Sequence, residues 1–126
     1  MMTRRQQRIT IMTCIYQYLL TGKDINDIFD ENLDINEKDS LSFIIENTVG
    51  VLNNLDELVE QIEPKLVDYQ FDRLGYVEQS LLLLSAYQLN QHDIDRAVII
   101  NEAIEIAKQY CDDKSPKFIN GVLDQL

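Results

Sequence analysis

The sequence predicts an all-α fold of about six to seven helices, and three observations support this prediction. Apolar residues recur at helical spacing along most of the 126-residue chain. Only four glycines and two prolines occur, so few positions break a helix. Residues that favour helices, such as Leu, Glu and Gln, are frequent, and no segment reads convincingly as a strand. A chain of this length fits one domain that can bury its own core.

The N-terminal region predicts one well-defined helix followed by an acidic segment. Residues 3–20 have an apolar face, with Thr3 as a candidate N-cap and Gly22 at the end. That face consists of Ile9, Met12, Ile15, Tyr16 and Leu19. Residues 24–35 are weakly periodic, so we expect a loop with a turn or two of helix around Ile28.

The middle of the chain predicts a second long helix over residues 36–52. The Asn53-Asn54 pair should break or bend it, and a third amphipathic segment follows over residues 55–62. Pro64 should then stop that segment or open a short helix around residues 66–71.

The C-terminal region predicts three further helices. Residues 76–91 include the most apolar stretch of the chain, so we expect a central, buried helix there. The next helix is expected over residues 96–110, and Ser115-Pro116 should begin the last one, from about 116 to the end.

Residues 1–126 are expected to form one cytoplasmic domain made of two helical bundles, about 1–74 and 75–126. The sequence has no segment typical of a signal peptide and no apolar run of ~18 residues that would cross a membrane. Cys14 and Cys111 lie far apart without ligand spacing, which predicts two reduced thiols.

The charge of the chain is unevenly distributed. The net charge is −11, which argues against broad binding to nucleic acid. However, Arg4, Arg5 and Arg8 cluster at the N-terminus, and no acidic residue precedes Asp24. The sequence therefore predicts an acidic body with one basic end, which can contact a few phosphates.

The sequence contains no recognisable catalytic or metal-binding motif. His92 is the only histidine, and its neighbours indicate an exposed turn between helices. The usual nucleophile, zinc-protease, phosphate-loop and dinucleotide motifs are missing. The acidic residues of segment 30–37 lack the glycine and the alternation of an EF-hand loop. We therefore expect a protein that is not an enzyme and needs no metal or cofactor.

The three N-terminal arginines allow two interpretations. With Tyr16 on the same helix, they would hold phosphates and offer a ring for base stacking. Alternatively, the N-terminus is frayed and solvated, and Tyr16 lies in the core. Composition alone leaves both interpretations open.

Two C-terminal segments resemble the signature segments of the NusB family. Residues 98–108 read Val-Ile-Ile-Asn-Glu-Ala-Ile-Glu-Ile-Ala-Lys, which resembles the family's INEAxELAK. Residues 117–124 read Lys-Phe-Ile-Asn-Gly-Val-Leu-Asp, which resembles KFxNGVLD. Residues 85–89 resemble the family's A-x-Y-E-L helix end, and residues 4–16 resemble its R-R-x-x-R…A-L-Y opening.

The resemblance implies an all-α fold of two packed helical bundles and a specific function. Family members are RNA-binding transcription antitermination factors rather than enzymes. The resemblance implies pairing with the small-subunit ribosomal protein also called NusE and binding to a boxA-type single-stranded RNA. It also implies association with the RNA polymerase elongation complex during ribosomal RNA synthesis. Some members self-associate, so a homodimer stays an open alternative.

Matching positions assign site residues by resemblance. The residues expected to contact RNA, or to lie near its path, are Arg4, Arg5, Arg8, Tyr16, Glu78, Lys117 and Phe118. The signature residues with expected structural roles are Asn101, Glu102, Asn120 and Gly121. Asn101 and Asn120 are expected to tie helix ends together. Gly121 costs ~1 kcal/mol against Ala inside a helix, so we expect a close helix approach there.

The sequence also departs from the family pattern. Glu78-Gln79 replaces a frequent Asp-Arg, and Leu83 replaces a usual Arg. The chain has no Trp, and Tyr69 or Phe71 is a candidate replacement. These losses and the −11 charge keep a second hypothesis open, namely a protein–protein adaptor with weak or no RNA binding. A NusB-like domain also precedes the catalytic domain of some ribosomal RNA cytosine methyltransferases, but we expect no catalytic domain here.

Overall fold

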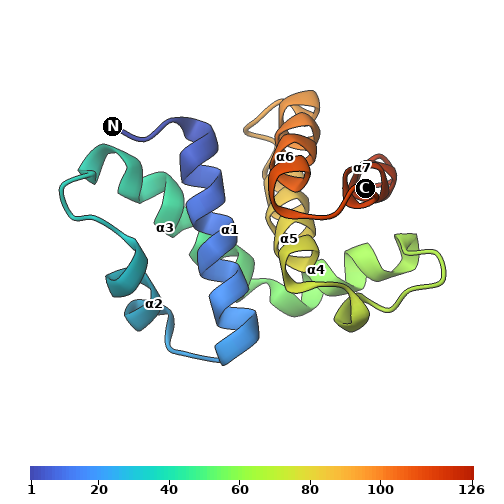
Figure 1. Cartoon of the computed structure of the whole chain (residues 1–126), viewed down its shortest axis with the longest axis horizontal. Helices are drawn as coiled ribbons and strands as arrows, with labels where there is room; N and C mark the ends of the chain where they lie inside the picture. The colour runs from blue at the N-terminus through green and yellow to red at the C-terminus, as the bar shows by residue number, and fades with distance from the viewer.

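The computed structural model describes residues 1–126, except for the side chain of Lys38. It contains seven α-helices and two short 3₁₀-helices (Figure 1). The α-helices are α1 (Arg4–Thr21), α2 (Ile25–Asn32), α3 (Lys38–Asn53), α4 (Leu55–Ile62), α5 (Tyr76–Gln91), α6 (Arg96–Tyr110) and α7 (Ser115–Leu123). The 3₁₀-helices are η1 (Glu63–Lys65) and η2 (Phe71–Arg73). No strand occurs in the described residues, which confirms the all-α prediction.

Local sequence signals explain both ends of α1. The Thr3 hydroxyl accepts a hydrogen bond from the Gln6 backbone N–H, and the Gln6 side chain accepts one from the Thr3 backbone N–H. This reciprocal arrangement is a capping box. Gly22 ends the helix with a φ of 68°, a left-handed conformation that glycine adopts without steric cost. Both predicted ends of this helix are therefore confirmed.

The segment between α4 and α5 differs from the sequence prediction. A short helix was expected around residues 66–71, but only the flanking segments η1 and η2 are helical. Asp68 has a φ of 65°, which a continuing right-handed helix does not allow. In contrast, the turn or two expected around Ile28 forms the eight-residue helix α2, whose first turn is capped by the Asp24 carboxylate.

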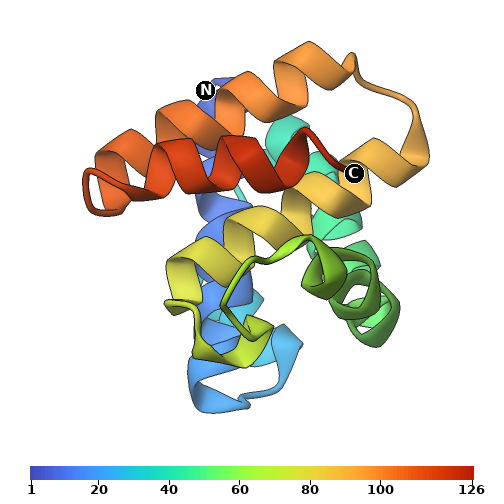
Figure 2. The same cartoon turned by 90° about the vertical axis from the view of Figure 1, so that its right-hand side faces the viewer.

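Helix α5 is the centre of the fold, as its apolar sequence predicts. It packs against α1 and α3 on one side and against α4, α6 and α7 on the others (Figures 1 and 2). Figure 2 also shows α6 and α7 running side by side over α5. Because α5 contacts helices from both halves of the chain, these helices share one core, and the division into two bundles near Gly75 stays a prediction.

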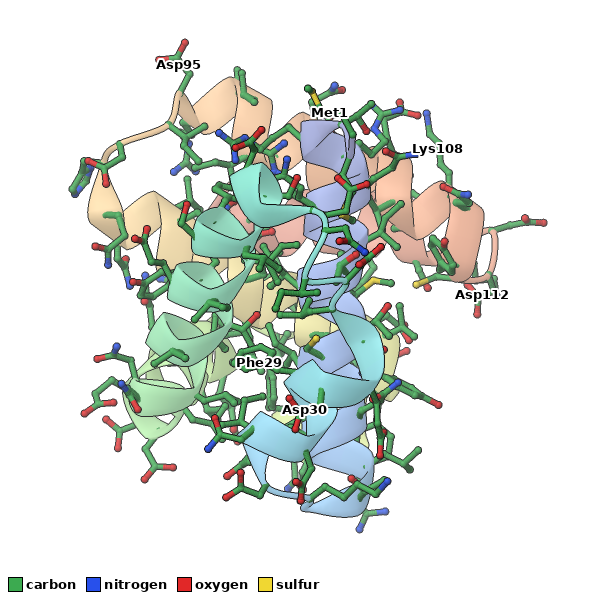
Figure 3. The ribbon with its side chains drawn as sticks, turned by 90° about the vertical axis from the view of Figure 1, so that its left-hand side faces the viewer. Met1, Phe29, Asp30, Asp95, Lys108 and Asp112 are labelled. Atoms are coloured by element: carbon green, nitrogen blue, oxygen red, sulfur yellow. The ribbon has the colours of Figure 1, made fainter. Side chains whose placement is uncertain are left out.

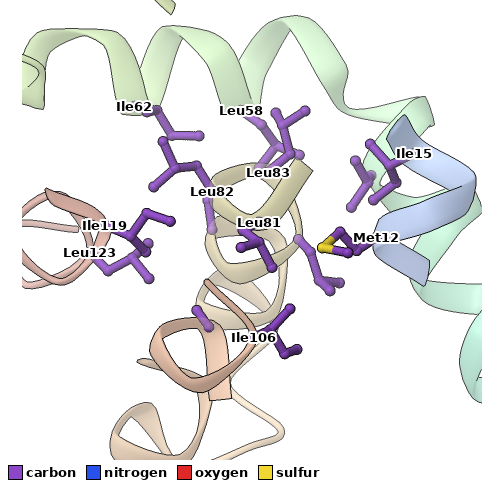
Figure 4. Packing of buried hydrophobic residues seen from close by; sticks show 14 of the residues in the cluster. Met12, Ile15, Leu58, Ile62, Leu81, Leu82, Leu83, Ile106, Ile119 and Leu123 are labelled. Atoms are coloured by element: carbon purple, nitrogen blue, oxygen red, sulfur yellow. The ribbon is translucent and has the colours of Figure 1, made fainter. Parts of the chain in front are cut away.

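The core is built around the leucines of α5. Leu81, Leu82 and Leu83 are each 1% exposed or less. Side chains from four other helices converge on them (Figure 4), namely Met12, Ile15, Leu58, Ile62, Ile106, Ile119 and Leu123. Burying each such side chain contributes about 1.5–3 kcal/mol, so this cluster fixes how the helices sit relative to one another. None of the described helices is long and apolar enough to cross a membrane.

Candidate nucleic-acid interface

The arginines at the start of α1 point in different directions. Arg4 and Arg8 are one helical turn apart and share a face, whereas Arg5 is about 100° further round the helix. Arg5 reaches α6, where its Nε donates to Glu102 Oε1 at 3.1 Å and its Nη2 donates to Glu102 Oε2 at 2.7 Å. About half of the Arg5 side chain is exposed, so it remains accessible to solvent while paired.

Arg8 is buried, and its charge is only partly compensated. Its side chain is 7% exposed, and Nη1 lies 3.8 Å from Glu102 Oε1. The Nε of Arg8 has no hydrogen-bond partner among the described residues. Burial lowers the pKa of Arg8, and the nearby Glu102 opposes this shift. A guanidinium stays protonated at neutral pH despite such a shift, so α1 holds a buried positive charge with an unused donor.

Arg4 faces α3. Its guanidinium carbon lies 3.9 Å from the centre of the Phe43 ring, and its Nη1 donates to Gln7 Oε1 at 2.8 Å. A cation over an aromatic face is attracted to the ring's quadrupole. The interpretation of a frayed, solvated N-terminus is therefore wrong, because α1 is capped and its arginines make defined contacts.

Tyr16 lies at the contact between α1 and the start of α5. Its ring meets that of Tyr76 edge to face, with centroids 6.2 Å apart. Tyr16 is half-buried and Tyr76 is 41% exposed, so this pair presents aromatic surface instead of filling the core. Sequence reasoning missed Tyr76, although an aromatic residue directly after Gly75 at a helix start was a usable signal.

Glu78 joins the start of α5 to the start of α7. The Ser115 hydroxyl donates to Glu78 Oε2 at 3.1 Å. Asp112 accepts hydrogen bonds from the backbone N–H groups of Lys114 and Ser115, and these lower the pKa of Asp112. The loop before α7 is thus ordered by two carboxylates, which fixes where the next residues of α7 lie.

Lys117 and Phe118 occupy the first turn of α7. Lys117 is exposed, and the half-buried Phe118 ring lies 5.7 Å from that of Tyr69, in an edge-to-face arrangement. Tyr69 is 57% exposed, whereas Phe71 is buried in the core. Of the two candidates for replacing the missing Trp, Tyr69 is the one that offers an exposed ring.

The signature residues have different environments. Glu102 binds two arginines, which also lowers the pKa of its carboxyl below the ordinary value, mainly through the hydrogen bond from Arg5. Asn101 is exposed and Asn120 is half-buried, and neither side-chain amide has a hydrogen-bond partner on another helix within the described part of the chain. The expectation that these two amides tie helix ends together is therefore wrong.

The expected close approach at Gly121 is also wrong. A Cβ atom added at Gly121 would meet nothing within 4 Å. The close approach occurs instead at Gly50 on α3, where a Cβ would collide with the ring of Tyr87 on α5. Neither glycine stands in a sequence context that reveals which one is crowded.

The predicted separation of a basic end from an acidic body is only partial, because Glu37 lies 3.6 Å from the N-terminal amine and Glu46 lies beside Arg4 and Arg8. Figure 3 shows Met1 at the arginine-bearing end of α1, and Asp30 on α2 beside the opposite end of that helix. Within the region that the structure describes, no three His, Cys, Asp or Glu side chains gather as metal ligands.

Comparisons with known proteins identify close similarities. A family model described as "NusB family" matches residues 5–126. The chain is 40% identical over 131 residues to the transcription antitermination protein NusB of Sulfurovum sp. (strain NBC37-1), covering 100% of this chain and 98% of that protein. NusB from T. maritima superposes with a TM-score of 0.90 at 32% identity, covering 98% of this chain and 89% of that chain. A structure of the antitermination factors NusB and NusE in complex with dsRNA matches with a TM-score of 0.85 at 27% identity, covering 98% of this chain and 96% of that chain.

Proposed function

This chain belongs to the NusB family, and on that premise we propose that it is a transcription antitermination factor. We propose that it binds boxA-type single-stranded RNA together with the ribosomal protein NusE and joins the RNA polymerase elongation complex. The similar structure of NusB and NusE with RNA supports this function. The observation that carries it in this chain is the ordered arginine helix, whose Arg5 reaches the surface beside α6.

The proposed RNA path follows contacts that link four helices in succession. Arg5 joins α1 to α6, and the Tyr16–Tyr76 pair joins α1 to the start of α5. From there, the Glu78–Ser115 hydrogen bond reaches the start of α7. These links support a single surface that combines cations with exposed rings.

Each part of this surface has a separate role in the proposal. Arg5, Arg8 and Lys117 attract phosphates, whereas Tyr16, Tyr76 and Phe118 offer rings to unstacked bases. Base stacking on an aromatic ring contributes about 1–3 kcal/mol per base. Glu78 acts indirectly in this proposal, because it positions the first turn of α7 through Ser115.

The acidic body suits the protein partner rather than the RNA. With a net charge of −11, most of the surface repels phosphate. A basic ribosomal protein on the acidic side would neutralise that charge and speed association. We therefore propose that tight RNA binding requires NusE. We also propose that the protein acts in the cytoplasm and catalyses no reaction.

The adaptor hypothesis remains the second candidate because of one observation. Glu102 already binds Arg5 and approaches Arg8, so part of the positive charge is neutralised within the chain. If Glu102 keeps both arginines, the protein would bind NusE without contacting RNA. RNA binding by the NusE complex therefore separates the two candidates.

Fluorescence anisotropy with a labelled boxA-type RNA, with and without NusE, tests the proposal across a salt series. We expect salt-sensitive binding that requires NusE. Arg5→Ala should weaken binding and reduce the slope of log K against log salt by about 1. Lys23→Ala is a matched control, because Lys23 is also exposed and paired, with Glu31 at 3.1 Å, but at the acidic end. A NusE complex that binds no RNA would favour the adaptor instead.

A further inference from the structure

A groove lies on the other side of the arginine helix from α6. It has a volume of about 850 Å³ and is formed by the start of α1, one face of α3, the end of α5 and the loop that follows. Figure 3 is viewed from the side on which α3 lies beside α1. A volume of this size is typical of sites that hold a small ligand or one group of a larger one.

The groove contains cationic groups with unused hydrogen-bonding capacity. Arg4 and Arg8 both line it. Arg8 is buried, yet its Nε–H lacks a partner, which leaves a costly unsatisfied donor in the unliganded protein. Arg4 makes no ion pair within the described residues and lies over Phe43. An oxyanion placed between these guanidinium groups would accept hydrogen bonds from their terminal N–H groups.

Two aromatic rings form the apolar part of the groove. Phe43 comes from α3 and Tyr87 from α5, and both are only partly buried. The Tyr87 ring lies so close to Gly50 that a side chain there would displace it. Gly50 thereby holds one ring at the wall of the groove, where it can stack with a planar group.

Amide side chains complete the lining. Asn47 and Gln88 hydrogen-bond to each other at 3.1 Å and form a buried polar contact below the surface. Asn53 and Gln91 are exposed at the groove, and their amides make no hydrogen bond among the described residues. Each free amide offers both donors and an acceptor, the groups that pair with the edges of nucleobases.

We propose that this groove holds one unstacked nucleotide of the bound RNA, a deepening that rests on the proposed RNA-binding function. The phosphate lies between Arg4 and Arg8, the base stacks on Tyr87 or on the Arg4 guanidinium that covers Phe43, and Asn53 or Gln91 contacts its edge. Such a combination of cation, ring and amide is how proteins recognise splayed-out bases.

Continuity with the arginine face favours RNA as the occupant. Arg8 lies between Glu102 on α6, at 3.8 Å, and the Phe43 ring on α3, at 5.7 Å. The groove and the surface beside α6 therefore adjoin each other along α1. Glu46 and Asp93 also line the groove, and their charges disfavour further phosphates, which limits the occupant to a single nucleotide.

Ultraviolet crosslinking of the complete complex with NusE and a boxA-type RNA tests this placement. Peptides that carry a crosslinked nucleotide are identified by mass spectrometry. We expect crosslinks at Phe43 or Tyr87 in addition to those at Tyr16 or Tyr76. Crosslinks confined to Tyr16, Tyr76 and Phe118 would overturn the groove proposal while leaving the proposed function intact. Absence of any RNA binding in the anisotropy assay would overturn both.

A matched pair of variants supplies an independent test. Phe43→Leu removes the ring but keeps apolar volume, and Phe29→Leu makes the same change on α2, at another half-buried Phe outside the groove. We expect Phe43→Leu to weaken RNA binding by ~5-fold or more and Phe29→Leu to leave it unchanged. Equal RNA affinity for both variants would overturn the proposal. Loss of NusE binding alone in Phe43→Leu would also overturn it, because the groove would then be a protein-docking surface.

If Phe43→Leu unfolds, as judged by circular dichroism, exposed positions replace it. Asn53→Ala combined with Gln91→Ala removes both free amides and leaves the core untouched. We expect a loss of RNA affinity of about 2- to 5-fold, consistent with the loss of one modest hydrogen bond. Unchanged affinity in this double variant would overturn the proposal.

Discussion

Arg5 and Glu102 form a two-pronged ion pair between α1 and α6, with hydrogen bonds of 3.1 and 2.7 Å. The same carboxylate lies 3.8 Å from Arg8. If Arg5 and Arg8 contact phosphates as proposed, Glu102 lies where a phosphate would have to bind. Glu102 would then both hold the arginines in place and compete with the RNA.

Glu102→Gln should raise RNA affinity while lowering stability slightly. Removing one negative charge beside Arg5 and Arg8 should strengthen RNA binding by roughly 5-fold at low salt, which corresponds to ~1 kcal/mol. The free energy of unfolding should fall by about 1 kcal/mol or less, because half of the Arg5 side chain is in solvent. Anisotropy titrations and urea denaturation measure the two effects.

Glu105→Gln is the control for that substitution. Glu105 lies one turn further along α6 and pairs with Lys108 at 3.2 Å instead of with an arginine of α1. Glu105→Gln removes the same charge as Glu102→Gln, so a purely global electrostatic effect on RNA binding would appear in both variants. An equal gain in RNA affinity would contradict the specific competition by Glu102.

The stability provided by Glu102 should depend on pH. The hydrogen bond from Arg5 holds the pKa of Glu102 below the ordinary value of 4.5. The Glu102 carboxylate therefore binds a proton less readily in the folded state than in the unfolded state. Its stabilisation of the fold is present above pH 4.5, the ordinary pKa of the group. It should be lost as the pH falls below 4.5 through the folded pKa. Urea denaturation of the wild type and Glu102→Gln should show a difference at neutral pH that shrinks in acid.

Much of the fold could be predicted from the sequence because its signals are local. Thr3 and Gly22 mark the two ends of α1, and the apolar run from Leu81 to Leu84 identifies the central helix. The segment around Asp68 was misjudged, because its left-handed backbone conformation depends on how the chain crosses from η1 to η2. Residue spacing contains no information about that crossing.

The candidate site was less predictable because its contacts join distant parts of the chain. The sequence identifies Arg4, Arg5 and Arg8 as a cluster, but helical geometry sends them to different neighbours. The pairing of Arg5 with a residue of α6, and the position of Arg4 over a ring of α3, depend on helix packing alone. One-dimensional spacing therefore predicts the groups but not their partners.

The two cysteines should react slowly and at different rates. Burial raises the pKa of both Cys14 and Cys111 to about 11, so little thiolate exists near neutral pH. Cys14 is fully buried, whereas Cys111 is partly exposed. Timed alkylation with iodoacetamide, followed by mass spectrometry, should modify Cys111 first. Modification of Cys14 at its rate in denaturant would show that the helices packed against α1 do not cover it.

Gly50→Ala and Gly121→Ala should change stability in opposite directions, although both replace a glycine inside a helix. Alanine is favoured over glycine in a helix by up to ~1 kcal/mol. Gly121 has open space around it and should show this gain. At Gly50 the new methyl group would collide with the Tyr87 ring, so displacement of that ring should cancel the gain and lower the melting temperature. Thermal unfolding of the two variants measures the difference, and equal stabilisation would contradict the contact between α3 and α5.

Because Tyr87 also lines the groove, Gly50→Ala should weaken RNA binding, whereas Gly121→Ala should leave the groove intact.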